Sequence, residues 1–258
     1  MAKTRFGKLF DLTDKVAVIT GGGSGIGRAV ALAFAEYGAR LALVDVDQTK
    51  AEAVAAEVSA LPGEAMAVKT DVTDAGAVDA MVARVLENFG RIDILFDNAG
   101  RGINKPAVDV SCDDWDKVIE LNLTGMFLCA QAVGKVMINQ GGGKIVITAS
   151  VSAALGHPNA VSYAASKHGV VGMMKVLANE WAAHNINVNA IGPGITSTPM
   201  TELVFTDKQR HDKLAQLVPM GRLATTDDLV GATVFLASRA SDYITGQIIY
   251  IDGGRLVD

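Results

Sequence analysis

Short apolar segments alternate with amphipathic segments along most of the chain. The first apolar segment, Val16–Thr20, is rich in β-branched residues and predicts a strand, and the helical spacing over residues 26–37 ends at Gly38. Further strands are expected over residues 40–45, 65–70, 92–96, 144–148, 187–191 and 247–251, and further helices over residues 49–60, 75–89, 115–137, 162–183 and 226–237. This order predicts an α/β fold: a single doubly wound (Rossmann-type) domain with a mostly parallel seven-stranded sheet and helices on both faces.

One long stretch interrupts the alternation. Residues 192–220 mix polar and apolar positions, prolines punctuate them, and an apolar group at residues 203–205 has no place in the strand–helix order. Long insertions in compact domains often serve as lids or binding loops. We therefore expect one catalytic domain over residues 1–258 with a mobile, lid-like insertion at about residues 192–220.

Composition and charge limit the function. The chain has 258 residues, half of them hydrophobic, and a formal net charge of −5, which favours one sizeable core and disfavours a nucleic-acid partner. We find neither a signal peptide nor an uninterrupted apolar window long enough for a bilayer, so we expect no membrane partner and a cytoplasmic protein. Cys112 and Cys129 form no CxxC pair and the histidines lack ligand spacing, so neither a disulfide framework nor a metal site is expected.

A glycine-rich loop, Thr20-Gly21-Gly22-Gly23-Ser24-Gly25-Ile26-Gly27, follows the first predicted strand. Glycines there allow a tight turn and close approach to a pyrophosphate, and the next helix offers free N–H groups to the phosphates. The loop predicts a dinucleotide site. Its expected contacts are Gly21, Ser24, Gly25, Ile26 and Gly27.

Asp45 indicates which dinucleotide binds. It ends the second predicted strand, about 20 residues after the loop, where a carboxylate accepts hydrogen bonds from ribose hydroxyls and repels a 2′-phosphate. Neither Ser24 nor Val46 offers a positive charge for that phosphate. We therefore expect NAD rather than NADP.

Three residues in the second half of the chain suggest proton-transfer chemistry. Tyr163 and Lys167 are four apart in a predicted helix and so share one face. A nearby ammonium is expected to lower the tyrosine pKa from roughly 10 toward the working pH, so that the hydroxyl can exchange a proton with an alcohol oxygen. Ser150 follows a predicted strand and is placed to hydrogen-bond the same oxygen.

With these motifs the chain resembles the short-chain dehydrogenase/reductase family over essentially its whole length. The loop looks like that family's TGxxxGxG, and Ser150, Tyr163 and Lys167 fall at its Ser–Tyr–xxx–Lys spacing. The resemblance implies hydride transfer between NAD(H) and a secondary alcohol or ketone, with Asn122 supporting a water-linked proton relay. It also implies a homotetramer, with the helices that contain Asn122 and Tyr163 at one interface. Further cofactor contacts implied are Tyr163 and Lys167 themselves and Asp71, Val72, Asn98, Ala99, Gly100, Pro193, Gly194, Thr196 and Thr198.

Two positions depart from the family pattern. The family usually reads NNAG where this chain has Asp97-Asn98-Ala99-Gly100, so that a carboxylate replaces an amide. If Asp97 is buried, it needs a hydrogen-bond donor or a raised pKa. Gly192 stands where alanine is commoner, and neither change touches the proton-transfer residues.

The substrate is less constrained. Segments at residues 7–12, 178–181 and 185–191 are similar to gluconate 5-dehydrogenases and 2-deoxy-gluconate 3-dehydrogenases, which favours a sugar acid or polyol. A hydrophobic alcohol, an acyl-carrier thioester and a non-catalytic NAD-sensing role remain alternatives. Asp45 and the acidic charge balance disfavour the thioester, and the intact catalytic set disfavours the sensor.

Several loop residues lie near the expected carboxyl ends of the strands, where ligands bind in such sheets. Arg101 and Lys105 are candidates for holding a substrate carboxylate. Asn104 and His157 are also placed to contact substrate, although His157 can equally cap a helix. For each loop cation, exposure to solvent is the competing interpretation.

Overall fold

A computed structural model describes residue 4 and residues 6–257. Seven strands form one sheet in the order β3-β2-β1-β4-β5-β6-β7, and all neighbouring pairs are parallel. The strands are β1 (Val16–Thr20), β2 (Arg40–Asp45), β3 (Glu64–Lys69), β4 (Ile94–Asp97), β5 (Gly143–Thr148), β6 (Ile186–Pro193) and β7 (Ile248–Ile251). The chain order reverses between β1 and β4, which is the point where ligands bind in open α/β sheets. The expected doubly wound fold is confirmed.

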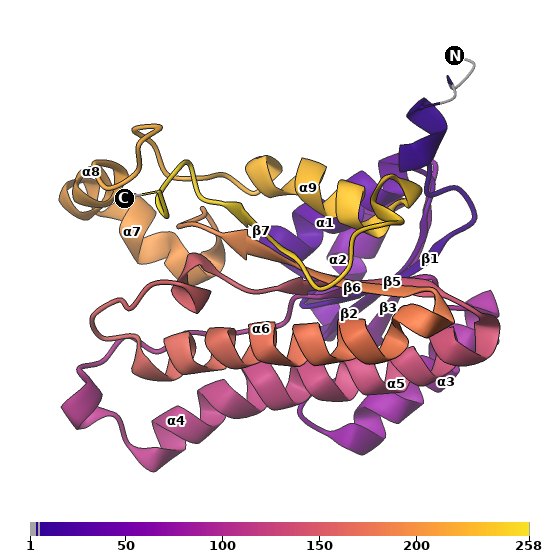
Figure 1. The fold of residues 1–258 in the computed structure, drawn as a ribbon, viewed down its shortest axis with the longest axis horizontal. Coiled ribbons are helices and arrows are strands. Elements are labelled where there is room, and N and C mark those ends of the chain that lie inside the picture. Colours follow the sequence, from indigo (N-terminus) through magenta and orange to yellow (C-terminus); the bar gives the residue numbers. More distant parts are fainter. Residues whose placement is uncertain (1–3, 5, 258) are drawn as a thin grey trace.

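Helices cover both faces of the sheet (Figure 1). One layer contains α1 (Gly25–Glu36), α2 (Gln48–Val58) and α9 (Asp227–Ala237). The other contains α3 (Ala75–Phe89), α4 (Cys112–Ile119), α5 (Met126–Gln140) and α6 (Val161–Trp181). Successive residues of each strand point to opposite layers: Val16 and Val18 pack with α3, α5 and α6, whereas Ala17 and Ile19 pack with α1, α2 and α9.

The helix expected over residues 115–137 is interrupted by a π-helical turn. Helical structure runs from Cys112 to Gln140, and residues Glu120–Gly125 form the π turn between α4 and α5. Such turns often occur at functional sites, and this one contains Asn122. By length and composition alone this helix could cross a membrane, contrary to the window search above, although α5 packs against α3 and α6 as part of a core layer.

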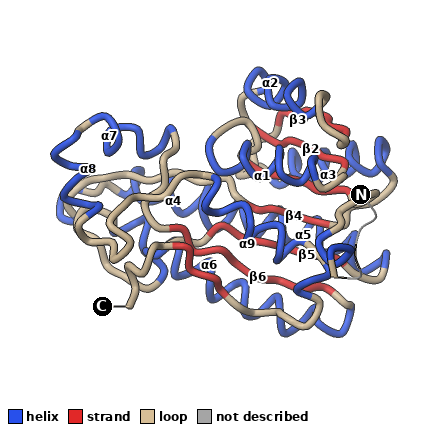
Figure 2. Tube along the Cα trace, turned by 90° about the horizontal axis from the view of Figure 1, so that it is seen from above, coloured by secondary structure: helices blue, strands red, loops and turns tan. Residues whose placement is uncertain are grey.

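The segment at residues 192–220 is not an irregular loop. It contains α7 (Glu202–Thr206) and α8 (Lys208–Ala215), which project beyond the carboxyl end of β6 (Figures 1 and 2). A small separate apolar cluster of Val204, Ala215 and Leu223 holds them together. Leu203 is 75% exposed, so only part of the apolar group at 203–205 is buried in this cluster.

Candidate active site

The glycine loop joins β1 to α1 at the reversal point of the sheet. Gly21 and Gly25 have φ angles of 63° and 53°, which favour glycine. A Cβ atom on Gly27 would lie 2.1 Å from the Gly21 carbonyl oxygen, so no larger residue fits the loop as built. In this part of the described chain, Ser24 precedes α1 without a side-chain capping bond, which leaves the first N–H groups of α1 available to an anion.

Asp45 ends β2, as the sequence predicted, and lies against this loop. One carboxylate oxygen accepts a hydrogen bond from the Gly23 N–H at 3.0 Å, and the other accepts one from the Asp47 N–H at 3.0 Å. Each oxygen keeps a second lone pair for a further donor. Asp45 therefore fixes the loop and can still accept hydrogen bonds from ribose hydroxyls.

Residues expected to contact adenine and the rest of the nucleotide follow β3 and β4. Asp71 is exposed and accepts hydrogen bonds from the Thr73 N–H and hydroxyl, which lower its pKa, while Val72 is buried in the core layer of α5. The Asn98 and Ala99 N–H groups donate to the Thr20 hydroxyl at 2.8 and 3.0 Å. These contacts place the loop after β4 directly beside the glycine loop, where Asn98, Ala99 and Gly100 were expected.

The structure brings Ser150, Tyr163 and Lys167 together beyond the end of β5. Ser150 begins the turn that follows β5, and its hydroxyl accepts a hydrogen bond from the Ser152 N–H at 3.1 Å. Tyr163 lies in the first turn of α6 and is hydrogen-bonded to Ser150. Lys167, one turn further, is 2% exposed, and its Nζ donates to the Thr148 carbonyl oxygen at 2.6 Å.

The pKa values of this set differ in part from the expectation. Burial raises the pKa of Tyr163 above its ordinary value, and the hydrogen bond with Ser150 only partly opposes this rise. The lowering expected from Lys167 is therefore not found in the protein alone, because the desolvation of the phenolate outweighs it. Burial lowers the pKa of Lys167 to about 8, opposed by the negative charge of Asp97.

Asn122 holds a loop rather than projecting into open space. Its side chain accepts a hydrogen bond from the Arg101 N–H at 2.8 Å and donates to the Arg101 carbonyl oxygen at 2.9 Å. It also donates to the Ser166 hydroxyl at 3.1 Å, and Ser166 donates to the Tyr163 carbonyl oxygen at 2.7 Å. The π turn thus couples the loop after β4 to the helix that carries Tyr163 and Lys167.

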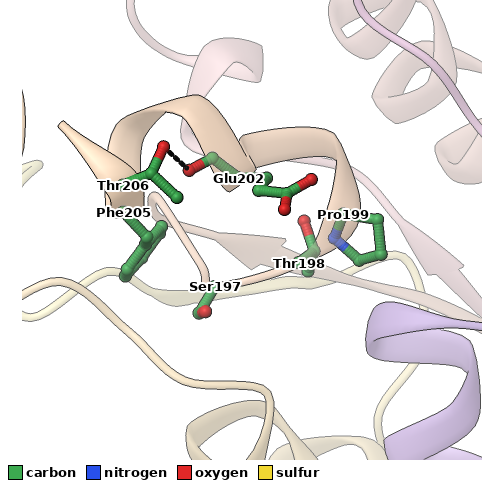
Figure 3. A pocket seen from close by; sticks show the side chains of 6 residues that line it. All are labelled: Ser197, Thr198, Pro199, Glu202, Phe205 and Thr206. Atoms are coloured by element: carbon green, nitrogen blue, oxygen red, sulfur yellow. Dashed lines mark hydrogen bonds between the residues drawn. The ribbon is translucent and has the colours of Figure 1, made fainter.

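The start of the expected lid lies against the glycine loop. β6 ends at Pro193, and Gly194 continues with its N–H donating to Ile251. Thr196 is buried, while a Cβ atom on Gly25 would lie 3.4 Å from the Thr198 side chain. A pocket of about 430 Å³ opens here (Figure 3). The residues that line it are Ser197, Thr198, Pro199, Glu202, Phe205 and Thr206.

The substrate candidates differ in their surroundings. Arg101 is exposed next to the Asn122 contact, and Asn104 is exposed further along the same loop. Lys105 donates to Asp114 at 2.8 Å, so its charge is already paired. His157 is partly buried, and its pKa is lowered by burial and by the positive charge of Arg255.

Sequence reasoning did not anticipate two of these partners. Asp114, which neutralises Lys105, also caps α4 together with Ser111, and such a box is visible in the sequence as Ser-Cys-Asp-Asp. The positive charge of Arg255, in the C-terminal segment, acts on His157, and no sequence spacing indicates that interaction.

Comparison with known proteins assigns the class. Residues 21–255 match the family profile described as Enoyl-(Acyl carrier protein) reductase, and the fold and site agree with it. The chain belongs to the short-chain dehydrogenase/reductase family and is an oxidoreductase that uses a nicotinamide cofactor. The resemblance inferred from the motifs is thereby confirmed.

Individual relatives are similar over nearly their whole length. The chain is 45% identical over 248 residues to D-threitol dehydrogenase of Mycolicibacterium smegmatis, covering 96% of this chain and 95% of that protein. It is 41% identical over 252 residues to NAD-dependent glycerol dehydrogenase of Listeria innocua, covering 98% of each. Among solved structures, a gluconate 5-dehydrogenase from Burkholderia cenocepacia in complex with NADP and tartrate superposes with a TM-score of 0.92 at 35% identity, covering 97% of this chain and 98% of that one.

Proposed function

We propose that this protein is an NAD(H)-dependent dehydrogenase that interconverts a secondary alcohol and a ketone, with a sugar acid or polyol as substrate. The observation that carries the proposal is the juxtaposition of Ser150 and Tyr163, joined by a hydrogen bond, with the buried Lys167 one helical turn away. This set lies beyond the carboxyl ends of the strands, at the same edge of the parallel sheet as the glycine loop. A titratable hydroxyl held beside a nucleotide loop suits proton transfer coupled to hydride transfer.

The residues divide the chemistry between them. Bound NAD would supply the acceptor for the hydride that leaves the carbinol carbon. In oxidation, the ionised Tyr163 hydroxyl takes the proton from the alcohol oxygen, and in reduction the neutral hydroxyl returns it. Ser150 donates a hydrogen bond to the same substrate oxygen and stabilises the charge that develops there. Because burial raises the Tyr163 pKa, its neutral form dominates near neutral pH, so oxidation is expected to be faster in alkaline solution.

Lys167 and Asn122 support the proton-transfer residue. The Lys167 ammonium, when charged, favours the ionised form of Tyr163 and is placed to hydrogen-bond the nicotinamide ribose. Asn122 holds the Arg101 backbone and, through Ser166, the first turn of α6. A water bound near Lys167 would complete the proton relay that the family resemblance implies.

Asp45 supports NAD as the cofactor over NADP. Its carboxylate lies beside the loop, where a 2′-phosphate would meet a negative charge. One relative is named as NAD-dependent, whereas the Burkholderia structure holds NADP, so the choice requires measurement. Titration of the native protein should give tighter binding of NAD, and Asp45→Ala should narrow the difference. Tighter binding of NADP to the native protein would contradict this assignment.

The remaining contacts proposed for the cofactor come from the loops around the strand ends. Asp71 and Val72 would border the adenine, and Asn98, Ala99 and Gly100 would border the ribose. Pro193, Gly194, Thr196 and Thr198 would reach the nicotinamide carboxamide, and the segment at residues 192–220 would close over it within a single catalytic domain. Closure would exclude water from the reacting carbon.

Substrate class and assembly follow from the same reasoning. The names of the similar dehydrogenases favour a polyol or sugar acid, and Arg101, which forms no ion pair with a carboxylate among the described residues, suits an acidic substrate. We also expect a cytoplasmic homotetramer in which the helices that contain Asn122 and Tyr163 form one interface. Size-exclusion chromatography with light scattering measures the assembly directly.

Two isosteric variants test the proposed reaction. A screen of sugar acids, polyols and hydrophobic alcohols with NAD should identify an active substrate. Tyr163→Phe should then lower turnover by about 100-fold or more while NAD binding changes by less than about threefold. Tyr243 is fully exposed, so Tyr243→Phe is the matched control and should leave turnover unchanged. Near-native turnover in Tyr163→Phe would refute the proton-transfer role.

A further inference from the structure

Asp97 is the last residue of β4, and its side chain faces the layer of α5 and α6. Leu95, two residues earlier, packs in that layer, whereas Ile94 and Phe96 pack in the opposite one. Because strand residues two apart share a face, Asp97 points to the same side as Leu95. Its strand partner is Ile147, which also packs in the α5 and α6 layer.

The Asp97 carboxylate is almost entirely removed from water, and only one of its two oxygens accepts a hydrogen bond from the described residues. The side chain is 1% exposed, and Oδ1 accepts a hydrogen bond from the Thr20 hydroxyl at 2.9 Å. Oδ2 is buried without a hydrogen-bond partner among the described residues. A buried carboxylate with one unpaired oxygen is costly, so a compensating positive charge is expected nearby.

Lys167 supplies the nearby charge. It reaches the sheet from α6, in the layer that Asp97 faces, and its Nζ ends at the carbonyl oxygen of Thr148. Thr148 directly follows Ile147, the strand partner of Asp97. The charges of Asp97 and Lys167 act on each other, and Asp97 also acts on the buried thiol of Cys129 on α5.

We propose that Asp97 is a positioning residue for the proton-transfer chemistry, whose buried carboxylate is the electrostatic partner of the Lys167 ammonium. This inference rests on the proposed function, since it concerns the protonation of a residue assigned to that reaction. Asp97 touches neither Tyr163 nor the substrate; it acts by favouring the charged form of Lys167. An asparagine at this position would keep an acceptor for Thr20 but carry no charge.

The pKa directions agree with this geometry. Burial raises the pKa of Asp97 to about 7, opposed by the Thr20 hydrogen bond and the Lys167 charge, and burial lowers the pKa of Lys167 to about 8. Each group thus counteracts part of the other's desolvation. Loss of the carboxylate should therefore lower the Lys167 pKa further and shrink the pH range in which Tyr163 lies beside an ammonium.

The pH profile of turnover in Asp97→Asn tests the coupling. In the profile of kcat for alcohol oxidation, we expect the step at which Lys167 loses its proton to move to lower pH by about half a unit or more, with an unchanged substrate KM. Asp93→Asn is the matched control, because Asp93 is also buried and immediately precedes β4 but pairs with Arg91 and Lys15 instead. A profile of Asp97→Asn that superposes on the native one would overturn the proposal.

A second measurement needs no activity and so separates this proposal from the proposed function. Asp97→Asn is introduced into the native protein and into Lys167→Met, and the melting temperature is followed near pH 8. Because the carboxylate has no ammonium partner in Lys167→Met, Asp97→Asn should raise the melting temperature there by at least about 3 °C more than in the native background. If the melting-temperature changes of Asp97→Asn and Lys167→Met are additive, the pairing is overturned. If the changes are coupled but the protein oxidises none of the alcohols tested, only the proposed function is contradicted.

Discussion

The protonation of Asp97 should control how stability depends on pH. Its pKa is about 7 in the folded protein, compared with 3.8 for an ordinary aspartate, because burial disfavours the carboxylate. Below the ordinary value both the folded and the unfolded chain hold the proton, and no penalty arises. As pH rises above that value only the unfolded chain loses the proton, so the free energy of unfolding decreases until the folded pKa is passed.

The size of the effect follows from the two pKa values. A difference of about 3 units corresponds to about 4 kcal/mol once both states are ionised, at 1.36 kcal/mol per unit. Near pH 5 the loss amounts to about 2 kcal/mol, and near pH 7.5 to about 4 kcal/mol. Asp97→Asn removes this dependence, so the stability of the variant relative to the native protein should grow by about 2 kcal/mol over that range.

Urea unfolding of the two proteins near pH 5 and pH 7.5 measures this growth at fixed protein concentration. Asp93→Asn should show the opposite trend: burial by itself raises the Asp93 pKa, but Arg91, the Val16 N–H and Lys15 outweigh burial and lower it. That variant should therefore lose stability relative to the native protein at neutral pH and approach it as the pH falls. If the free energies of unfolding of Asp97→Asn and the native protein differ by the same amount at both pH values, the reasoning is refuted.

Three further predictions concern the cofactor loop, the substrate and the lid. Gly27→Ala places a Cβ atom 2.1 Å from a carbonyl oxygen and should abolish NAD binding by calorimetry, whereas Gly231→Ala, with no atom near its added Cβ, should bind normally. Arg101→Ala should raise KM for a sugar acid by about tenfold and leave KM for a neutral polyol unchanged. Lys105→Ala should raise KM for the sugar acid less, because Lys105 already pairs with Asp114. Equal effects of Arg101→Ala on both substrates would contradict the assignment. Amide exchange over residues 195–215 should slow when NAD and substrate are both bound, and unchanged exchange would remove the lid from the mechanism.

The sheet was predictable because its signal is local. Strands buried on both faces, such as Val16–Thr20, are continuous apolar runs, and the glycine loop follows the first of them in a fixed order. That Tyr163 and Lys167 share a face of α6 was predictable for a similar reason, since a four-residue spacing on a helix determines which side chains share a face. Spacing gives no information about how far those side chains are removed from solvent. The predicted lowering of the Tyr163 pKa was therefore wrong, because burial raises it.

Features that depend on distant partners were not predictable. The π turn at Glu120–Gly125 has a sequence that an α-helix also accepts, and it becomes distinct only where Asn122 binds the Arg101 backbone. The helices α7 and α8 are short and pack on the cluster around Val204, which includes Leu223 from beyond the segment. Pairing of Lys105 with Asp114 likewise requires the loop to fold back on α4.

A single hydrogen-bond network links the glycine loop to Lys167 across three adjacent strands. The hydroxyl of Thr20, the first residue of the glycine loop, accepts hydrogen bonds from the Asn98 and Ala99 N–H groups, and the Asn98 side chain accepts one from the Thr148 hydroxyl at 3.1 Å. The carbonyl oxygen of Thr148 in turn holds Lys167. Because Thr20 also donates to Asp97, one threonine sets both the position of the nucleotide loop and the solvation of the carboxylate that faces Lys167. The glycine loop and Lys167 therefore belong to one polar network, and we expect a substitution at the end of β4 to affect both.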